Sequence, residues 1–265
     1  MREVLFLLAL GYTVLALANG GADSKSRVYF PNVDAIRLGG DYECHLQDVY
    51  FNGKALYWAH TLALVKTDLS GNILAKVDVK DHHAGLEVRD GKVFVAVCAM
   101  QGKTGGKTLS DSRVTINVYD AETLKLLESH VTDINDRSGS LAILEDGTFL
   151  IGCLRPPDIT KTQVRFHHLD RNFKLLKSYV LDNVPVELGI ETIKRHNGYF
   201  YLSHYTGNLC IKLDRNFKEV GRYNVNGTCG LVFDGDKIWV GATWLKPGTK
   251  RWVSGLNSIV PPSGF

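Results

Sequence analysis

The sequence predicts an all-β protein that folds as a five-bladed β-propeller, and three features support this. After each of the first four predicted hairpins a third strand ends in Asp, a turn follows, and a fourth strand begins. One such turn is nearly duplicated, as LDRNFKLL at 169–176 and LDRNFKEV at 213–220. Four strands per unit, repeated every ~40–55 residues, are typical of propeller blades. The hairpins are marked by dipeptides with strong turn preference, each between β-prone segments: Asn52-Gly53, Asp90-Gly91, Asp146-Gly147, Asn197-Gly198 and Asp234-Gly235.

The first unit is the clearest of the five. Strands are expected at 44–51 and 54–60, on either side of the first turn, and then at 63–68 and 73–79. The later units repeat this plan with segments rich in β-branched and aromatic residues after each turn. Insertions at 101–112 and 156–161 lengthen the second and third units.

The fifth hairpin is not followed by a clear fourth strand. We expect residues 251–260 to supply its third strand and the N-terminal segment 27–33 to supply its fourth. This arrangement would close the ring with strands from both ends of the chain.

The N-terminus has the pattern of an export signal. Residues 4–17 are almost wholly apolar, and Ala16-Leu17-Ala18 matches a small-residue cleavage site. The predicted organisation is a signal peptide at 1–18, a flexible N-terminus at 19–26 and a single propeller domain at 27–265. Localisation is therefore expected to be secreted or periplasmic, with no membrane span after signal removal, since no second apolar run is long enough.

The charge and the cysteine content limit the kinds of partner and of covalent cross-link to expect. The chain has 265 residues, 31 basic and 28 acidic, and its net charge of +3 is too mild and scattered to indicate nucleic acid. Five widely spaced cysteines without a C-x-x-C do not form a disulfide framework. Whether Cys44 and Cys229 pair stays open. We expect a monomer that takes a small-molecule or glycan ligand.

The turns also predict which residues face each other. In tight hairpins, residues at equal distances from the turn are cross-strand neighbours. This places His45 opposite His60, His83 opposite Cys98, and Glu191 opposite His204, all at the rim where the inner strands begin. The prediction requires hairpins free of bulges, because one bulge shifts the register by one residue.

Histidine and glutamate at one end of a channel suit general acid–base chemistry or a divalent metal. Catalytic roles are therefore assigned to His45, His83, Glu191 and His204. One divalent metal ion is the candidate cofactor, with His45, His60 and His83 as its ligands. A purely structural role for these side chains is the alternative. His167-His168 is expected in a third strand, far from the channel.

Other side chains are expected to contact the ligand rather than react with it. Aromatic rings offer stacking faces to sugars, and arginine binds anionic groups. The residues assigned to this role are Gln47, Trp58, Arg155, Tyr205 and Trp244.

Several stretches resemble a family of exported bacterial propeller-like proteins of uncharacterised function: HLQ (45–47), LYWAHTLALVKTD (56–68), HHAG (82–85) with DGKVFVAV (90–97), and LGIET (188–192). The resemblance covers most of the chain and implies the fold and export, not a reaction. That family commonly has HHGD where this chain has His82-His83-Ala84-Gly85, so no carboxylate role is expected there. Similarity to NHL-type and gluconolactonase-like propellers is architectural only.

Two functions follow as expectations. The first is a hydrolase or lyase acting on a carbohydrate or another small polar substrate at the channel mouth. The second is a non-catalytic propeller that binds a glycan or a protein. Propeller glycosidases use two or three carboxylates. Glu191 is the one carboxylate that the register places at the mouth, with Asp48 and Glu187 as weaker candidates, which counts against standard glycosidase chemistry.

Overall fold

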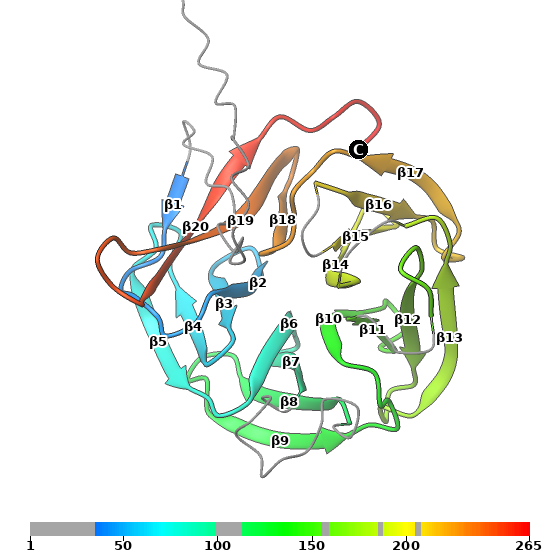
Figure 1. The fold of residues 1–265 in the computed structure, drawn as a ribbon. Coiled ribbons are helices and arrows are strands. Elements are labelled where there is room, and N and C mark those ends of the chain that lie inside the picture. Colours follow the sequence, from blue (N-terminus) through cyan, green and yellow to red (C-terminus); the bar gives the residue numbers. More distant parts are fainter. Residues whose placement is uncertain (1–34, 99–112, 155–158, 185–187, 205–207) are drawn as a thin grey trace, which may run out of the picture.

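The computed structural model describes residues 35–98, 113–154, 159–184, 188–204 and 208–265. Over these ranges the chain forms five four-stranded antiparallel sheets arranged around a central channel (Figure 1). The five-bladed β-propeller is therefore confirmed. Within the described ranges, no helix is long and apolar enough to cross a membrane.

Each of the first four sheets is a continuous run of four strands. Blade 1 contains β2 (Leu46–Phe51), β3 (Leu56–His60), β4 (Ala63–Thr67) and β5 (Ile73–Asp78). Blade 2 contains β6 (His82–Arg89), β7 (Lys92–Cys98), β8 (Thr115–Asp120) and β9 (Leu126–Val131). Blade 3 contains β10 (Ser138–Ile143), β11 (Phe149–Cys153), β12 (Val164–Leu169) and β13 (Leu175–Leu181). Blade 4 contains β14 (Ile190–His196), β15 (Tyr199–His204), β16 (Cys210–Leu213) and β17 (Glu219–Tyr223).

Blade 5 joins the two ends of the described chain. It contains β18 (Leu231–Asp234), β19 (Lys237–Leu245), β20 (Trp252–Ile259) and β1 (Ala35–Arg37), with β1 outermost and paired to β20. The third strand is thus the one predicted. The fourth comes from residues just after the predicted segment 27–33, which lies outside the described residues, as do 1–18 and 19–26. Backbone pairing of Tyr42 with Trp252 extends this closure.

Two of the five predicted turns have the expected two-residue form. Arg89 pairs with Lys92 and His196 with Tyr199, so Asp90-Gly91 and Asn197-Gly198 are the loop residues. All four loop residues have positive φ, as the hairpin turns that match strand twist require. In the fifth hairpin Asp234 pairs with Lys237, so the two-residue loop is Gly235-Asp236, one residue beyond the predicted dipeptide. The first and third hairpins have longer loops, since Phe51 pairs with Leu56 and Ile143 with Phe149.

The apolar core lies between the blades. Five separate clusters of buried side chains each join two neighbouring blades. Trp58, for example, packs with Leu46 and with Val232 of blade 5 at the junction between blades 5 and 1. Each sheet therefore buries both of its faces, which accounts for the nearly continuous apolar character of β3 and β11.

The inner strands, which are β2, β6, β10, β14 and β18, converge so closely that side chains are excluded at some positions. A Cβ on Gly139 would lie 2.1 Å from the carbonyl oxygen of Ile190 in the next blade. A Cβ on Gly85 would lie 2.4 Å from Cα of Ser140. Glycine is required here by backbone-to-backbone contact around a narrow channel.

Candidate functional site

Bulges at the start of the inner strands decide which side chains face the channel. In β2, Leu46 pairs with His60 and Asp48 with Ala59, which leaves Gln47 as the extra residue. In β14, Ile190 pairs with His204 and Thr192 with Ser203, which leaves Glu191 as the extra residue at the equivalent position.

The predicted cross-strand partners are therefore wrong by one residue. His60 faces Leu46 instead of His45, and His204 faces Ile190 instead of Glu191. In blade 2, Cys98 faces His82, and His83 faces Val97. A bulge inserts one residue into one strand of a pair, so all residues beyond it change partner.

A cluster of polar side chains occupies the mouth, the end of the channel where the inner strands begin. Gln47 Nε2 lies 2.8 Å from His45 Nε2, 2.8 Å from Thr61 Oγ1 and 3.2 Å from His82 Nε2. We call His45, Gln47, Thr61 and His82 the mouth cluster. His45 is only partly buried, whereas Gln47 and Thr61 are almost fully buried. Two imidazoles from neighbouring blades are thus oriented toward one amide nitrogen.

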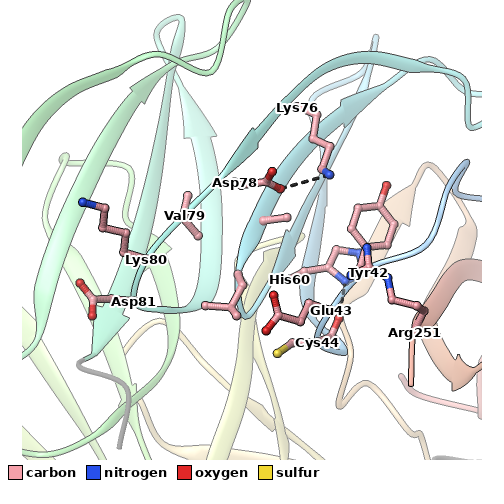
Figure 2. Close-up of a pocket in the computed structure, with 12 residues that line it drawn as sticks. Tyr42, Glu43, Cys44, His60, Lys76, Asp78, Val79, Lys80, Asp81 and Arg251 are labelled. Carbon is pink, nitrogen blue, oxygen red and sulfur yellow. Dashed lines mark hydrogen bonds and ion pairs between the residues drawn. The ribbon is translucent and has the colours of Figure 1, made fainter. Parts of the chain in front are cut away.

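A cleft of about 630 Å³ adjoins this cluster on the mouth face of blade 1 (Figure 2). Four of its lining residues are sequence neighbours of mouth-cluster residues: Cys44, His60, Leu62 and Asp81. The other lining residues come from loops and strands of blades 1 and 5 and include both signs of charge: Tyr42, Glu43, Ala63, Lys76, Asp78, Val79, Lys80 and Arg251. A hollow of this volume is the size of a small-ligand site. We call it the rim cleft.

His60 lies at the rim cleft in a fixed protonation state. Its ring stacks on Tyr42 at 3.9 Å between centroids, and Nδ1 donates to the carbonyl oxygen of Cys44 at 3.1 Å. Burial lowers the pKa of His60 to about 3, so the imidazole is neutral and Nε2 carries a lone pair. Nε2 has no hydrogen-bond partner among the described residues.

His204 repeats this arrangement in blade 4. Nδ1 lies 3.3 Å from the carbonyl oxygen of Gly189, and burial lowers the pKa of His204 to about 4. Its Nε2 is also buried without a hydrogen-bond partner in the described part of the chain. His60 and His204 are the last residues of the equivalent strands β3 and β15, so the same histidine-to-carbonyl hydrogen bond occurs in two blades.

The His83 side chain is directed into blade 2 and does not join the mouth cluster. Nε2 is 2.6 Å from the Tyr119 hydroxyl and Nδ1 is 3.0 Å from the carbonyl oxygen of Asp81, so both ring nitrogens are already engaged. His45, His60 and His83 consequently share no metal position in this structure. In the described ranges, the group whose ligand atoms lie close enough for a metal ion is a different one, Asp136, Cys153 and His167.

The predicted ligand-contacting residues divide into four cases. Gln47 is central to the mouth cluster. Trp58 is not at the site: it is fully buried between blades, and its Nε1 donates to Thr67 Oγ1 at 3.0 Å. Trp244 is partly exposed, with the Arg37 guanidinium 4.8 Å from its ring centroid. Arg155 and Tyr205 lie outside the described residues, as does Glu187.

Below the mouth, a charged network fills the channel. Lys194 Nζ lies 2.7 Å from Asp48 Oδ2 and donates to the carbonyl oxygen of Leu86 at 3.1 Å. Asp48 also accepts backbone N–H groups from Val49 and Leu86. Burial raises the pKa of the Asp48 carboxyl, against the opposing effect of the Lys194 ammonium. Because each Asp48 oxygen already accepts a hydrogen bond, this carboxylate is a poor candidate for substrate chemistry.

Sequence reasoning missed several of these residues. Thr61 lies within the LYWAHTLALVKTD stretch (56–68) but has no distinct signal of its own, and Lys194 belongs to no motif. His82 is present in the HHAG stretch, but the assumed register turned His83 toward the channel in its place.

Comparisons with known proteins agree on the fold and give no family. No family model and no curated protein matches the sequence. Among solved structures, glutaminyl cyclase of Myxococcus xanthus is 12% identical with a TM-score of 0.57, over 86% of this chain and 96% of that one. A GH43 protein of Bacillus licheniformis is 11% identical with a TM-score of 0.61, over 87% of this chain and 55% of that one. A Bacteroides caccae protein of unknown function is 12% identical with a TM-score of 0.51, over 78% and 81% of the two chains. At such identities the similarity shows the propeller fold alone.

Proposed function

We propose that this propeller binds a small polar substrate, such as a carbohydrate, at the channel mouth and rim cleft, and hydrolyses or eliminates it. The observation that carries the proposal is the convergence of His45 and His82 on the Gln47 side chain, beside a cleft of ligand size. An imidazole that is partly exposed and oriented by a fixed neighbour is suited to exchanging protons with a bound ligand.

Each residue at the mouth has a proposed role. His45 is the acid–base group because it is the most accessible imidazole of the mouth cluster. Gln47 and Thr61 orient it and contact ligand hydroxyls. Glu191, at the position in blade 4 that Gln47 occupies in blade 1, supplies a carboxylate from another side of the ring. His45, His60 and His83 have no joint metal-binding role in this proposal, because both ring nitrogens of His83 are engaged by Asp81 and Tyr119.

Solved neighbours include proteins with hydrolytic names, among them a GH43 protein and a xylan β-1,4-xylosidase. They motivate the choice of test substrates. Export, predicted from residues 1–18, would bring the protein into contact with extracellular glycans outside the cell or in the periplasm.

A second candidate is a binding module without turnover. It is favoured by the state of Asp48, whose carboxylate is held by Lys194 and two backbone N–H groups. Glycosidases of the common type need two carboxylates flanking the scissile bond. With Asp48 engaged, Glu191 is the other carboxylate of the described inner strands at the mouth, and the remaining carboxylates of the proposed site are those of Glu43, Asp78 and Asp81 in the rim cleft.

The test uses aryl xylosides, aryl arabinosides and xylo-oligosaccharides with the purified full chain. Turnover by the wild type that falls by about 100-fold or more in His45→Ala and Glu191→Gln would support catalysis. Matched controls are His130→Ala and Glu128→Gln, a histidine–glutamate pair on the outer strand β9. Binding without turnover, weakened by the mouth variants alone, would favour the binding module. Turnover unaffected by either mouth variant would refute the assignment.

A further inference from the structure

Three metal-binding side chains meet on blade 3, and none of them belongs to the mouth cluster. Asp136 precedes β10, Cys153 ends β11, and His167 lies in β12. One ligand atom from each lies within 4.8 Å of the other two. Cys153 and His167 are buried and Asp136 is half-buried, so the donors are largely shielded from solvent.

The His167 ring is already oriented on both sides. Nε2 donates to Asp136 Oδ2 at 2.9 Å, and the Ser178 hydroxyl lies 2.8 Å from Nδ1. Metal-ligating histidines are typically held by a hydrogen bond on the other ring nitrogen. If Nε2 binds a metal, the ring proton moves to Nδ1. Nδ1–H then donates a hydrogen bond to Ser178 Oγ, whose own hydrogen rotates away.

The donor set selects the class of metal. One nitrogen, one oxygen and one sulfur suit a borderline-soft divalent ion in tetrahedral geometry, whereas Ca²⁺ and Mg²⁺ take oxygen ligands. In such a complex the three donors lie roughly 3.3–3.6 Å apart. Donor pairs at the upper limit of 4.8 Å therefore need to approach by at most about 1.5 Å, and the Asp136–His167 pair at 2.9 Å needs to open slightly.

We propose that Asp136, Cys153 and His167 form a zinc-binding site. Binding releases the Cys153 thiol proton to solvent, and the thiolate, the imidazole and the carboxylate supply three of the four ligands. Because the donors come from the segment leading into blade 3 and from two of its strands, the metal would tie that segment to the blade. The inference is independent of the function proposed for the mouth.

Arg165 competes with zinc for the Asp136 carboxylate, so its removal should strengthen zinc binding where removal of a ligand weakens it. Its guanidinium Nη1 lies 3.1 Å from the same oxygen, Asp136 Oδ2, that faces His167. Zinc must compete with this cation for the carboxylate. Arg165→Gln should therefore tighten zinc binding, whereas it should weaken an ion-pair cluster that has no metal function.

The experiment strips the purified full chain with a chelator, titrates it with Zn²⁺, and repeats the titration with Co²⁺. We expect one ion per chain and a thiolate-to-cobalt charge-transfer band. Cys153→Ala and His167→Ala should weaken binding by more than the roughly 10–100-fold typical of losing a hydrogen-bond partner of a ligand. Ser178→Ala should fall within that range. Two control variants should bind zinc like the wild type. Cys210→Ala removes a buried cysteine in blade 4, and His168→Ala removes the histidine next to His167.

Three results would overturn the proposal. They are substoichiometric metal in the wild type, a cobalt complex without the thiolate band, or binding that survives Cys153→Ala. The cobalt spectrum is recorded on the wild type, so that result does not depend on whether a variant folds.

Discussion

Lys194 Nζ and Asp48 Oδ2 lie 2.7 Å apart and join two blades that are not neighbours in the ring, blade 4 and blade 1. The same ammonium donates to the carbonyl oxygen of Leu86 in blade 2. Glu87 follows Leu86 in blade 2, and its Oε2 accepts the backbone N–H of Ile143 in blade 3 at 2.6 Å. Polar side chains thus link four blades through the channel, below the mouth cluster.

The first prediction concerns this ion pair. Lys194→Met should lower the free energy of unfolding by about 3–5 kcal/mol, because it leaves Asp48 buried without its cation. Urea denaturation measures the loss. Lys92→Met, which breaks an exposed pair with Glu128, is the matched control and should cost no more than about 1 kcal/mol. The double variant Asp48→Asn with Lys194→Met should recover part of the stability. Equal effects of the two single substitutions would show that the channel pair is not the link described.

The second prediction is a pH dependence set by Glu87. Burial raises the pKa of Glu87 from 4.5 to about 7, so the folded chain holds this proton more tightly than the unfolded chain. Between pH 4.5 and 7 the unfolded state therefore binds fewer protons than the folded state. The Glu87 carboxyl consequently lowers the free energy of unfolding as pH rises through this range. Glu87→Gln removes that penalty. Its advantage over the wild type should grow by on the order of 3 kcal/mol between pH 4 and pH 8. Denaturation midpoints at the two pH values give the comparison, and a constant difference would contradict it.

The third prediction runs in the opposite direction and comes from three buried histidines. Burial lowers the pKa of His60 to about 3, and those of His83 and His204 to about 4, against 6.5 when exposed. Below pH 6.5 the unfolded chain gains protons that the folded chain excludes, so stability is lost as pH falls from 6.5 toward 4. Three such groups give a slope of roughly 4 kcal/mol per pH unit near pH 5. His204→Gln should reduce the proton uptake on unfolding by about one, and an unchanged acid transition would count against neutral burial.

The fourth prediction tests the close approach of the inner strands. Gly139→Ala would place a Cβ 2.1 Å from the Ile190 carbonyl oxygen, and backbone must move to relieve it. We expect a loss of at least about 1–3 kcal/mol, seen as a lowered thermal midpoint. Gly39→Ala is the control, since its nearest neighbour would lie at 3.5 Å. A variant of Gly139 as stable as that control would mean that the strands are further apart than described.

The propeller was predictable because its signals are local and repeated. The turn dipeptides and the duplicated LDRNF turn specify units of four strands, and five such units give the ring. The closure of blade 5 by strands from both ends of the chain also follows, since the fifth unit has too few strands of its own. The described closing strand, β1, lies just after the predicted segment 27–33, and with only three residues it carries little pattern.

The site was harder to predict, for a physical reason. Bulges at Gln47 and Glu191 arise where five inner strands converge, which is a property of the assembled ring and not of any one hairpin. An inserted residue in β2 separated His60 from His45 in register, and a separate register shift between His83 and Leu86 moved His83 from Cys98 to Val97. Lys194 reaches Asp48 through 146 residues of sequence separation, and no local pattern encodes such a contact.

The most direct test of the mouth as the functional site is a thermal-shift screen of small sugars and other small polar compounds against the wild type and two variants, Gln47→Ala and Glu191→Gln. His130→Ala serves as the folded control. We expect compounds that raise the wild-type midpoint to raise that of His130→Ala as well, and to lose most of their effect in the mouth variants. Ligands that stabilise all four proteins equally would contradict this and place the binding site elsewhere on the propeller.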